Sequence, residues 1–389
     1  MGKGSLANRK KIGIFTGYYP PHLGGVERYT DKLSGALEKL GYNIVIVTSN
    51  SNDLINHEKI GNRSLYRLPI HKLAKDRYPM PKTNAEYKEL ISQVKNEKID
   101  YYIVNTRFHL TSFVGAKIGK GLGRPVMLIE HGTNHFTVNN RWLDYIGLVY
   151  EHLLTYRLKH YVDRFYGVSK KCNVWLEHFS IHASGVFYNA VDTADKKIAN
   201  DYYVDKYSGN EVVITYAGRL IKEKGIMNLL EAFVEIKKKN PKLRMKMVIA
   251  GDGALLETIK RNHNDSSIDI LGKLDFEHVI SLLKRTDIFV HPSLYPEGLP
   301  TSILEAGLMG CAVIATPRGG TEEVIIDERH GIIVDGSTES LQKAIQELIV
   351  DSRMRKELAD KLRHRTEETF NWDVVAKEVD REINSLTME

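Results

Sequence analysis

Two acidic residues, Glu297 and Glu305, stand eight positions apart in the segment with the clearest chemistry of this 389-residue sequence. Proline at position 300 lies near the start of the helix expected there, and Glu305 follows a little over one turn later. The first amides of a helix have no intrahelical partner and suit a phosphate or sugar oxygen. We therefore expect Glu305 to reach a ribose hydroxyl and Glu297 to accept hydrogen bonds from sugar hydroxyls. The backbone expected to contact the same ligand comprises Gly298, Leu299, Pro300 and Thr301. The alternative is a solvated Glu297 and a buried, capped Glu305.

Two cations follow one expected strand, at 211–217. Gly218 and Arg219 stand at its end, and Lys224 comes five residues later. The carboxyl ends of strands in open α/β sheets border the ligand crevice, where Arg and Lys suit a diphosphate through bidentate and point-charge contacts. The alternative is a pair of exposed surface cations, which loses weight once this motif and the acidic segment are taken together.

The elements that would position these residues alternate between strand and helix. An apolar run at 11–16, a Gly- and Pro-rich loop, helical periodicity over 27–40 and a β-rich run at 42–48 predict a βαβ unit with parallel strands. Further strands are expected at 101–105, 125–130 and 165–168.

A second alternation begins at residue 211 and predicts another sheet. Its expected strands cover 211–217, 245–250, 268–271, 288–291 and 312–316, and its expected helices cover 225–239, 254–263, 277–285, 300–309, 338–349 and 352–370. The fold class predicted is α/β, with two Rossmann-like, doubly wound domains. We expect the first domain to span 1–205, the second 206–370, and a helix within 371–389 to pack back on the first.

Length and composition agree with this organisation. A chain of 389 residues suits two domains, and 42% hydrophobic with 27% charged residues is typical of a folded globular protein. The two cysteines, Cys172 and Cys311, have no CxxC partner, which disfavours a disulfide framework and a structural zinc site and favours a reducing cytoplasm. No apolar run approaches the roughly 20 residues that cross a bilayer.

The ordered set of motifs resembles glycosyltransferase family four, of the GT-B fold. Besides the acidic and cationic segments, the resemblance rests on PHLGGVER at 21–28, AGDG at 250–253 and HPS at 291–293, and it extends from about residue 12 to residue 372. The resemblance implies two domains facing a central cleft, a retaining transferase, a nucleotide-sugar donor on the C-terminal domain and an acceptor on the N-terminal domain.

The resemblance also implies roles for single residues. Arg219 and Lys224 look like the pair that stabilises the donor diphosphate as the leaving group gains charge. Glu305 resembles the residue that holds the ribose, and Glu297 the one beside the transferred sugar. Gly24 and Gly25 would let the chain approach the diphosphate closely at a helix N-terminus. His131, in EHGT at 130–133, matches the family's histidine that faces the donor sugar.

Two departures and several alternatives bear on this interpretation. Ala190 stands where the family usually has glycine, at the expected crossing between domains. No Asp-x-Asp triplet occurs, so we expect no metal and no other cofactor.

A nucleotide-sugar epimerase of the same architecture, a phosphorylase and a non-catalytic nucleotide-binding protein remain alternatives. A phosphorylase would need a pyridoxal phosphate lysine and a longer chain. An NAD dehydrogenase would need GxGxxG after the first strand, which the loop at 17–25 does not provide.

Charge is distributed unevenly along the chain. Residues 1–200 hold 29 Lys and Arg against 17 Asp and Glu, and residues 201–389 hold 26 against 32, so the two parts carry +12 and −6. The stretch from Arg141 to Tyr161 mixes aromatic, aliphatic and basic residues, which is typical either of a membrane-interface helix or of a helix with core aromatics. Further basic residues of this part are Lys72, Lys75, Arg77 and Lys82. We expect a UDP-sugar donor, a glycan, lipid-linked or protein-linked acceptor, no nucleic-acid partner, and a cytoplasmic protein that binds an anionic membrane surface peripherally.

Overall fold

The computed structural model describes residues 10–22, 24–73, 78–137, 140–263 and 265–386. The chain folds as two compact units. The first unit contains the chain up to Tyr188 together with the segment from Trp372 onward, and the second unit runs from Asn189 to Asn371. Lys75 and Arg77, two of the basic residues counted in the first part of the sequence, lie outside the described residues.

The first unit is built on an eight-stranded sheet in the order β10-β9-β8-β7-β1-β2-β4-β3. All neighbouring pairs are parallel except β3 with β4. Central strands are buried almost throughout, as expected where helices cover both faces of a parallel sheet. The strands are β1 (Lys11–Phe15), β2 (Asn43–Ser49), β3 (His57–Ile60), β4 (Arg63–Leu68), β7 (Tyr101–Asn105), β8 (Val126–Glu130), β9 (Arg164–Gly167) and β10 (Gly185–Val186), with a separate hairpin of β5 (Ile70–Leu73) and β6 (Tyr78–Pro81).

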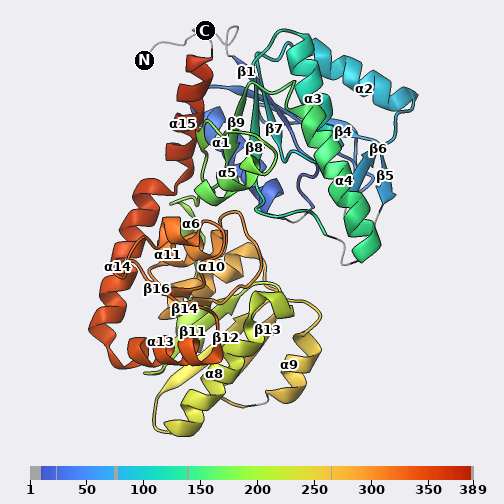
Figure 1. Cartoon of the computed structure of the whole chain (residues 1–389). Helices are drawn as coiled ribbons and strands as arrows, with labels where there is room; N and C mark the ends of the chain where they lie inside the picture. The colour runs from blue at the N-terminus through green and yellow to red at the C-terminus, as the bar shows by residue number, and fades with distance from the viewer. Residues whose placement is uncertain (1–9, 23, 74–77, 138–139, 264, 387–389) are drawn as a thin grey trace, which may run out of the picture. The chain divides into compact units, whose positions relative to one another are not determined.

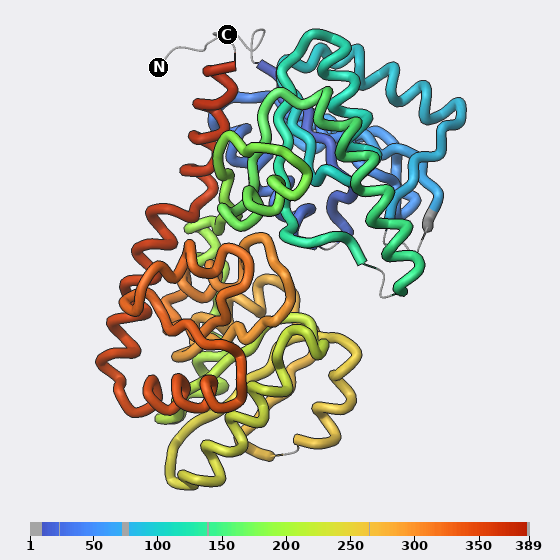
Figure 2. The backbone as a smooth tube through the Cα atoms, in the orientation of Figure 1, coloured from blue at the N-terminus to red at the C-terminus, as the bar shows by residue number. Residues whose placement is uncertain are grey.

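The helices of the first unit are α1 (Gly25–Lys39), α2 (Ala85–Asn96), α3 (Leu110–Gly121), α4 (Arg141–Leu158), α5 (Lys170–Glu177) and α15 (Trp372–Ser385). Side-chain caps begin α2, α4 and α5, where Asn84, Asn140 and Ser169 accept hydrogen bonds from first-turn amides. Helix α15 packs alongside α1, as Figure 1 shows. Figure 2 traces the same red C-terminal segment beside the blue and green chain of this unit.

Polar and aromatic contacts fix α15 to the rest of the first unit. The Tyr42 hydroxyl donates to Asp380 at 2.6 Å, and the Tyr166 hydroxyl donates to Glu382 at 2.6 Å. The ring of Tyr29 meets Trp372 edge to face, with centroids 5.1 Å apart. Residues from the end of the chain thereby complete a unit whose sheet is formed by its beginning.

The second unit has a six-stranded parallel sheet in the order β13-β12-β11-β14-β15-β16. Numbered within the unit, this order is 3-2-1-4-5-6, the arrangement of the doubly wound dinucleotide-binding fold. The strands are β11 (Val212–Ala217), β12 (Met245–Ala250), β13 (Ile268–Gly272), β14 (Ile288–His291), β15 (Ala312–Ala315) and β16 (Ile332–Ile333). The helices are α6 (Asp195–Ile198), α7 (Tyr202–Lys206), the 3-10 turn η2 (Lys222–Lys224), α8 (Ile226–Lys239), α9 (Leu256–Asn262), α10 (Phe276–Arg285), α11 (Thr301–Met309), α12 (Thr321–Val324), α13 (Thr338–Val350) and α14 (Ser352–Thr369).

The boundary between the units differs from the sequence expectation. The prediction ended the first domain at residue 205, whereas the structure divides the chain after Tyr188. Helices α6 and α7 pack against α10, the amide of Asn200 donates to the Ser281 hydroxyl at 3.0 Å, and Arg285 bonds the carbonyl of Tyr207 at 2.7 Å. These contacts assign 189–207 to the second unit, a feature that the polar composition of the segment does not reveal.

None of the helices in the described part of the chain combines the length and apolar character that a bilayer crossing requires.

Candidate active site

The second unit places its two predicted cations at the point where strand order reverses. Arg219 lies two residues beyond β11, and Lys224 ends the short turn η2 that follows. Chain connections run in opposite directions from β11 and β14, which are neighbours in the sheet, and ligands of doubly wound folds bind beside such a reversal. The cations therefore stand where this architecture provides a ligand crevice.

Gly225 explains how Lys224 comes so close to the loop after β14. Its backbone is left-handed, with φ of 71°, and a Cβ there would lie 2.0 Å from the carbonyl oxygen of Pro292. Only glycine allows this approach without strain. The amide of Leu294 also donates to the carbonyl of Glu223 at 2.8 Å, so the two loops are joined by a backbone hydrogen bond.

Glu297 accepts hydrogen bonds from two basic side chains. Lys224 Nζ lies 2.7 Å from Glu297 Oε1, and His291 Nε2 lies 3.0 Å from the same oxygen. The Ser302 hydroxyl is 3.3 Å from the other ring nitrogen of His291. The side chains of Lys224 and Glu297 are only 13% and 15% exposed, so this charge-assisted contact is shielded from solvent. The Glu297 carboxylate therefore joins the end of a strand to a 3-10 turn, and His291 links both to the first turn of α11 through Ser302.

The electrostatics of Glu297 favour its charged form. Burial opposes ionisation, but the hydrogen bonds and charges of His291 and Lys224 outweigh it and hold the pKa of Glu297 well below its ordinary value. Burial, reinforced by the negative charge of Glu297, raises the pKa of the nearby Tyr216 phenol. Glu297 is consequently a permanent acceptor at neutral pH, which suits hydrogen bonding to hydroxyls and not proton donation.

Arg219 and Lys224 share an aromatic neighbour. The Arg219 guanidinium carbon lies 5.7 Å from the ring centre of Tyr295, and Lys224 Nζ lies 5.4 Å from it. Both distances are in the range of cation–π attraction. Arg219 is exposed, and the Tyr216 hydroxyl holds its backbone by donating to its carbonyl at 2.8 Å. The Tyr295 ring thus lies close to both cations that the sequence predicted at this site.

The segment from Glu297 to Glu305 is fixed at both ends. Gly319, with φ of 56°, approaches so closely that a Cβ would lie 2.2 Å from the Glu297 carbonyl oxygen, and the Gly320 amide donates to the carbonyl of Gly298 at 2.7 Å. Pro300 caps α11 in extended conformation, and Glu305 is buried at 5% exposure within that helix. The predicted order of acidic residue, turn and helix start is therefore present, and α11 begins at Thr301. Leu299 is buried, and its carbonyl accepts from Asn189 at 2.7 Å.

The remaining predicted residues belong to the first unit. Gly24 precedes α1 in extended conformation, and Gly25 begins that helix, with nothing within 4 Å of where its Cβ would lie. At Gly24 a Cβ would meet the Glu27 carboxylate at 2.2 Å. Glu27, which is buried and 2.8 Å from His22 Nδ1, places a negative charge in the first turn of this helix. The sequence interpretation did not anticipate this carboxylate beside the proposed diphosphate-binding amides.

His131 follows β8 and is held in one orientation. Its Nε2 donates to Asn105 Oδ1 at 2.9 Å, its ring meets Tyr29 edge to face at 4.7 Å, and Asn105 in turn donates to the Thr30 hydroxyl at 2.9 Å. Burial, with a smaller contribution from the charge of His109, lowers the pKa of His131 to about 3. The imidazole is therefore neutral at physiological pH.

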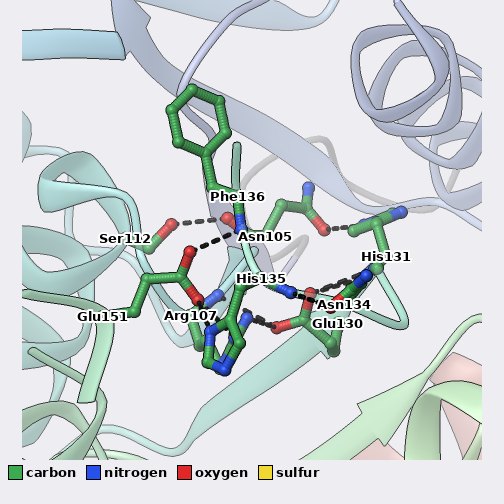
Figure 3. Close-up of polar contacts among 10 residues, drawn as sticks. Asn105, Arg107, Ser112, Glu130, His131, Asn134, His135, Phe136 and Glu151 are labelled. Atoms are coloured by element: carbon green, nitrogen blue, oxygen red, sulfur yellow. Dashed lines mark hydrogen bonds and ion pairs between the residues drawn. The ribbon is translucent and has the colours of Figure 1, made fainter. Parts of the chain in front are cut away.

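A buried charge network lies next to His131 and was missed by the sequence interpretation. Arg107, with no exposed surface, contacts Glu130 at 3.2 Å and Glu151 at 2.8 Å (Figure 3). Glu130 accepts from the amides of His131 and Gly132, each at 3.1 Å. The network sets the path of the loop after β8 and so the position of His131.

Sequence signals for these missed residues differ in strength. His291 could have been found, because it ends a strand six residues before Glu297 and belongs to the HPS motif. Arg107, Glu130 and Glu151 are separated by 23 and 21 positions and carry no common spacing, so only the fold brings them together.

Helix α4 carries exposed apolar side chains along one face. Trp142 is 82% exposed, and Tyr145, Ile146, Val149, Leu153 and Tyr156 follow it at helical spacing with 42 to 65% exposure. Of the aromatic residues in this stretch, Trp142, Tyr145 and Tyr156 are exposed, whereas Tyr150 and Tyr161 are partly buried. Beside them lies an apolar pocket of about 280 Å³ that involves Tyr78, Met80, Phe108, Phe136 and Tyr150.

Comparisons with known proteins agree with the geometry. Residues 23–195 match the model of the family described as Glycosyltransferase Family 4, and residues 205–365 match that of Glycosyl transferases group 1. An uncharacterised glycosyltransferase of Methanocaldococcus jannaschii is 29% identical over 381 residues, which cover 95% of this chain and 96% of that protein. A GDP-mannose-dependent monoacylated α-(1-6)-phosphatidylinositol monomannoside mannosyltransferase of Corynebacterium glutamicum is 23% identical over 383 residues, which cover 95% of this chain and 97% of that protein.

The same architecture occurs among solved structures. HepE of Anabaena, crystallised with UDP, superposes with a TM-score of 0.74 at 17% identity, over 97% of this chain and 100% of that one. The two family matches together extend over most of the sequence, and the relatives align along nearly their whole length. The chain therefore belongs to glycosyltransferase family four and has the GT-B fold.

Proposed function

We propose that this glycosyltransferase moves a sugar from a UDP-sugar to a lipid-linked glycan acceptor, with retention of anomeric configuration and without a metal ion. The observation that carries the donor site is the Lys224–Glu297–His291 contact beside Arg219, at the β11–β14 reversal. The UDP found in the similar HepE structure supports the choice of nucleotide, while the GDP-mannose of the corynebacterial relative is its competitor.

Each residue then has a defined task on the second unit. Arg219 and Lys224 bind the diphosphate and stabilise the negative charge that accumulates as the bond between the anomeric carbon and the phosphate oxygen breaks. Lys224 has three N–H donors and can contact phosphate while it keeps its bond to Glu297. Glu297 accepts hydrogen bonds from the hydroxyls of the transferred sugar, and Glu305 holds the ribose. Gly298 and Thr301 contribute amides, with Leu299 and Pro300 shaping the turn between them.

The acceptor hydroxyl attacks the anomeric carbon from the face that the diphosphate leaves. A donor phosphate oxygen takes the proton of that hydroxyl, so the products are the glycosylated acceptor and the protonated nucleotide. The neutral imidazole of His131, with its Nε2 proton committed to Asn105, contacts the donor sugar as a polar neighbour in this proposal. The backbone at Gly24 and Gly25 approaches the diphosphate.

The lipid-linked acceptor is supported by the first unit. An apolar pocket and an exposed apolar face of α4 lie together there, and the corynebacterial relative is named for a phosphatidylinositol mannoside acceptor. Isolated exposed apolar residues are ordinary, but a continuous apolar face on one helix marks an interaction surface. We propose that this face inserts into the interface of an anionic membrane, at its cytoplasmic side.

Three substitutions test the donor site. Lys224→Ala and Glu305→Gln each lower transfer at least 100-fold and weaken UDP binding, measured by product formation and by calorimetry on folded protein. Lys222→Ala is the matched control, because Lys222 is an exposed cation of the same 3-10 turn. Unchanged UDP affinity in both variants, with unchanged circular dichroism, would remove the assignment.

Donor and stereochemistry are tested directly. A panel of UDP-, GDP- and ADP-sugars is screened for thermal stabilisation and for slow donor hydrolysis, and UDP-sugars are expected to raise the melting temperature most. Proton NMR of the product formed early in the reaction reports the anomeric configuration. A product of inverted configuration contradicts the mechanism, and stabilisation by GDP-sugars alone contradicts the choice of base.

Metal independence has its own experiment. Because Arg219 and Lys224 supply the positive charge, transfer is expected to stay within about twofold of its original rate after EDTA treatment and desalting. Activity that disappears and returns only with Mg²⁺ or Mn²⁺ is the contrary result.

A further inference from the structure

Three histidines from separate segments meet on the first unit. His135 lies in the loop after β8, His152 lies on α4, and His178 caps the end of α5. One ring nitrogen of each lies within 4.8 Å of the others. Tetrahedral zinc, with Zn–N bonds of 2.0 to 2.1 Å, holds its nitrogens about 3.4 Å apart. Small rotations of three side chains would bring them to that spacing.

His135 is hydrogen-bonded to a buried carboxylate, as metal-binding histidines typically are. Its Nδ1 donates to Glu151 Oε2 at 2.9 Å, which leaves Nε2 for a metal (Figure 3). Glu151 is buried at 2% exposure and is itself held by Arg107 at 2.8 Å and by the amide of Phe136 at 2.6 Å. A carboxylate on the far nitrogen fixes the tautomer and orientation of a ligating imidazole and raises its basicity.

Aromatic packing restrains the other rings. Trp175 stacks on His178 with centroids 4.9 Å apart and an angle of 6°, and it meets His135 edge to face at 4.9 Å. The three imidazole centroids lie 5.1 to 5.4 Å apart. His178 is exposed, whereas His135 and His152 are half-buried, so one side of the cluster is open to solvent. Three nitrogen ligands and an open fourth position describe the usual arrangement of a water-bearing zinc site.

We propose that His135, His152 and His178 form a binding site for a divalent transition metal, with zinc as the natural occupant and water or an added ligand in the fourth position. Imidazole ligands favour zinc, copper and nickel over magnesium or calcium, which prefer oxygen. The site shares no residue with the proposed donor site, so transfer does not require its metal, and it joins the loop after β8 to α4 and α5. The proposal departs from the expectation of no metal, and the three histidine positions have no short spacing that the sequence alone would single out.

The experiment uses the untagged full chain after removal of metal by chelation. Zinc chloride is titrated in by calorimetry, and cobalt is added separately to follow its visible absorption. One zinc per chain, a rise in melting temperature and the strong absorption of tetrahedral cobalt are expected. His178→Ala, an exposed position, weakens zinc binding at least tenfold and removes the cobalt band. The control, His182→Ala at another exposed position, leaves both unchanged.

A second variant tests the role of Glu151. Glu151→Gln keeps the shape of the side chain and is expected to weaken zinc binding about 10- to 100-fold, as loss of such a partner usually does. If this buried substitution prevents folding, His178→Ala alone still decides the proposal. Absence of zinc binding to the intact chain, or equal affinity in intact and His178→Ala proteins, overturns it.

Discussion

At the scale of the residue, His109 and His131 of the first unit are kept neutral by burial. Burial lowers the pKa of His109 to about 4 and, with a smaller effect of His109, that of His131 to about 3, from an ordinary value of 6.5. Between pH 6.5 and 4 the unfolded chain therefore binds protons at these positions and the folded chain does not. Stability must fall as the pH falls through this window.

The substitution His131→Gln tests whether His131 contributes to this loss of stability at low pH. Each such histidine removes about 1.4 kcal/mol of unfolding free energy per pH unit below 6.5. Gln cannot titrate but can still donate a hydrogen bond to Asn105. Between pH 6 and 4.5, His131→Gln is therefore expected to reduce the slope of unfolding free energy against pH by up to about 1.4 kcal/mol per pH unit. Urea denaturation at several pH values measures the slope. An identical slope in the variant would show that His131 titrates normally.

Candidate site residues could be predicted from the sequence where a single continuous segment carries them. Arg219 and Lys224 follow a strand, Glu297 precedes a helix and Glu305 lies inside that helix, so the visible periods of these elements predict where each residue falls. The His291 bond to Glu297 and the Arg107 pairs with Glu130 and Glu151 depend on which strands become neighbours. A single sequence does not reveal that pairing order.

At the scale of the element, the turn between β11 and α8 controls how the two cations are presented. Gly225 and Gly272 have nearly equal φ, 71° and 72°, but a Cβ at Gly225 meets Pro292 whereas one at Gly272 meets nothing within 4 Å. Alanine at Gly272 therefore introduces backbone strain alone, whereas alanine at Gly225 introduces the same strain together with a steric collision.

Alanine at these two positions is expected to behave differently. Gly272→Ala costs about 1 to 2 kcal/mol, the usual left-handed penalty. Gly225→Ala costs more, because the loop must move away from Pro292, and it weakens UDP binding at least tenfold by displacing Lys224. Urea denaturation and calorimetry measure the two effects. Equal stability and equal UDP affinity in the two variants would contradict the role given to this contact.

Elements were predictable in proportion to their regularity. Expected strands at 11–16, 101–105, 245–250 and 288–291 agree with β1, β7, β12 and β14, because buried parallel strands are short, continuous apolar runs. Strands β3 to β6 and helices α2, α3 and α5 were not foreseen. The segment 57–81 mixes basic and apolar residues without a clear period. Strand β3 is an exposed edge strand, β5 and β6 form a hairpin, and the buried β4 has the mixed sequence RSLYRL, so none of them is an apolar run.

At the scale of the whole molecule, charge and apolar exposure point to a surface partner. The first 200 residues carry +12, and the exposed apolar face of α4 belongs to the same part of the chain. A Lys or Arg near an anionic bilayer contributes about 1 kcal/mol, so a few suffice for reversible binding. Screening shortens the Debye length from about 10 Å at 0.1 M salt to about 3 Å at 1 M.

Vesicle sedimentation checks this expectation. Binding to anionic vesicles is expected at low salt and release at high salt, and the double change Trp142→Ser with Tyr145→Ser weakens binding at least fivefold. Val350→Ser, at a 77% exposed position of the second unit, is the control and changes nothing. Neutralising Lys72, Lys75 and Arg77 also weakens binding while donor hydrolysis stays constant. Failure of the intact protein to sediment with anionic vesicles at low salt would favour a soluble acceptor.

The division of the first unit between the two ends of the chain has a consequence for biosynthesis. Tyr29, Tyr42 and Tyr166 receive their partners on α15 only after the entire second unit has been translated. The second unit, continuous from Asn189 to Asn371, can finish folding on the ribosome while the first still lacks a helix. The nascent first sheet must wait with an uncovered α1, so the order of completion is the reverse of the order of synthesis.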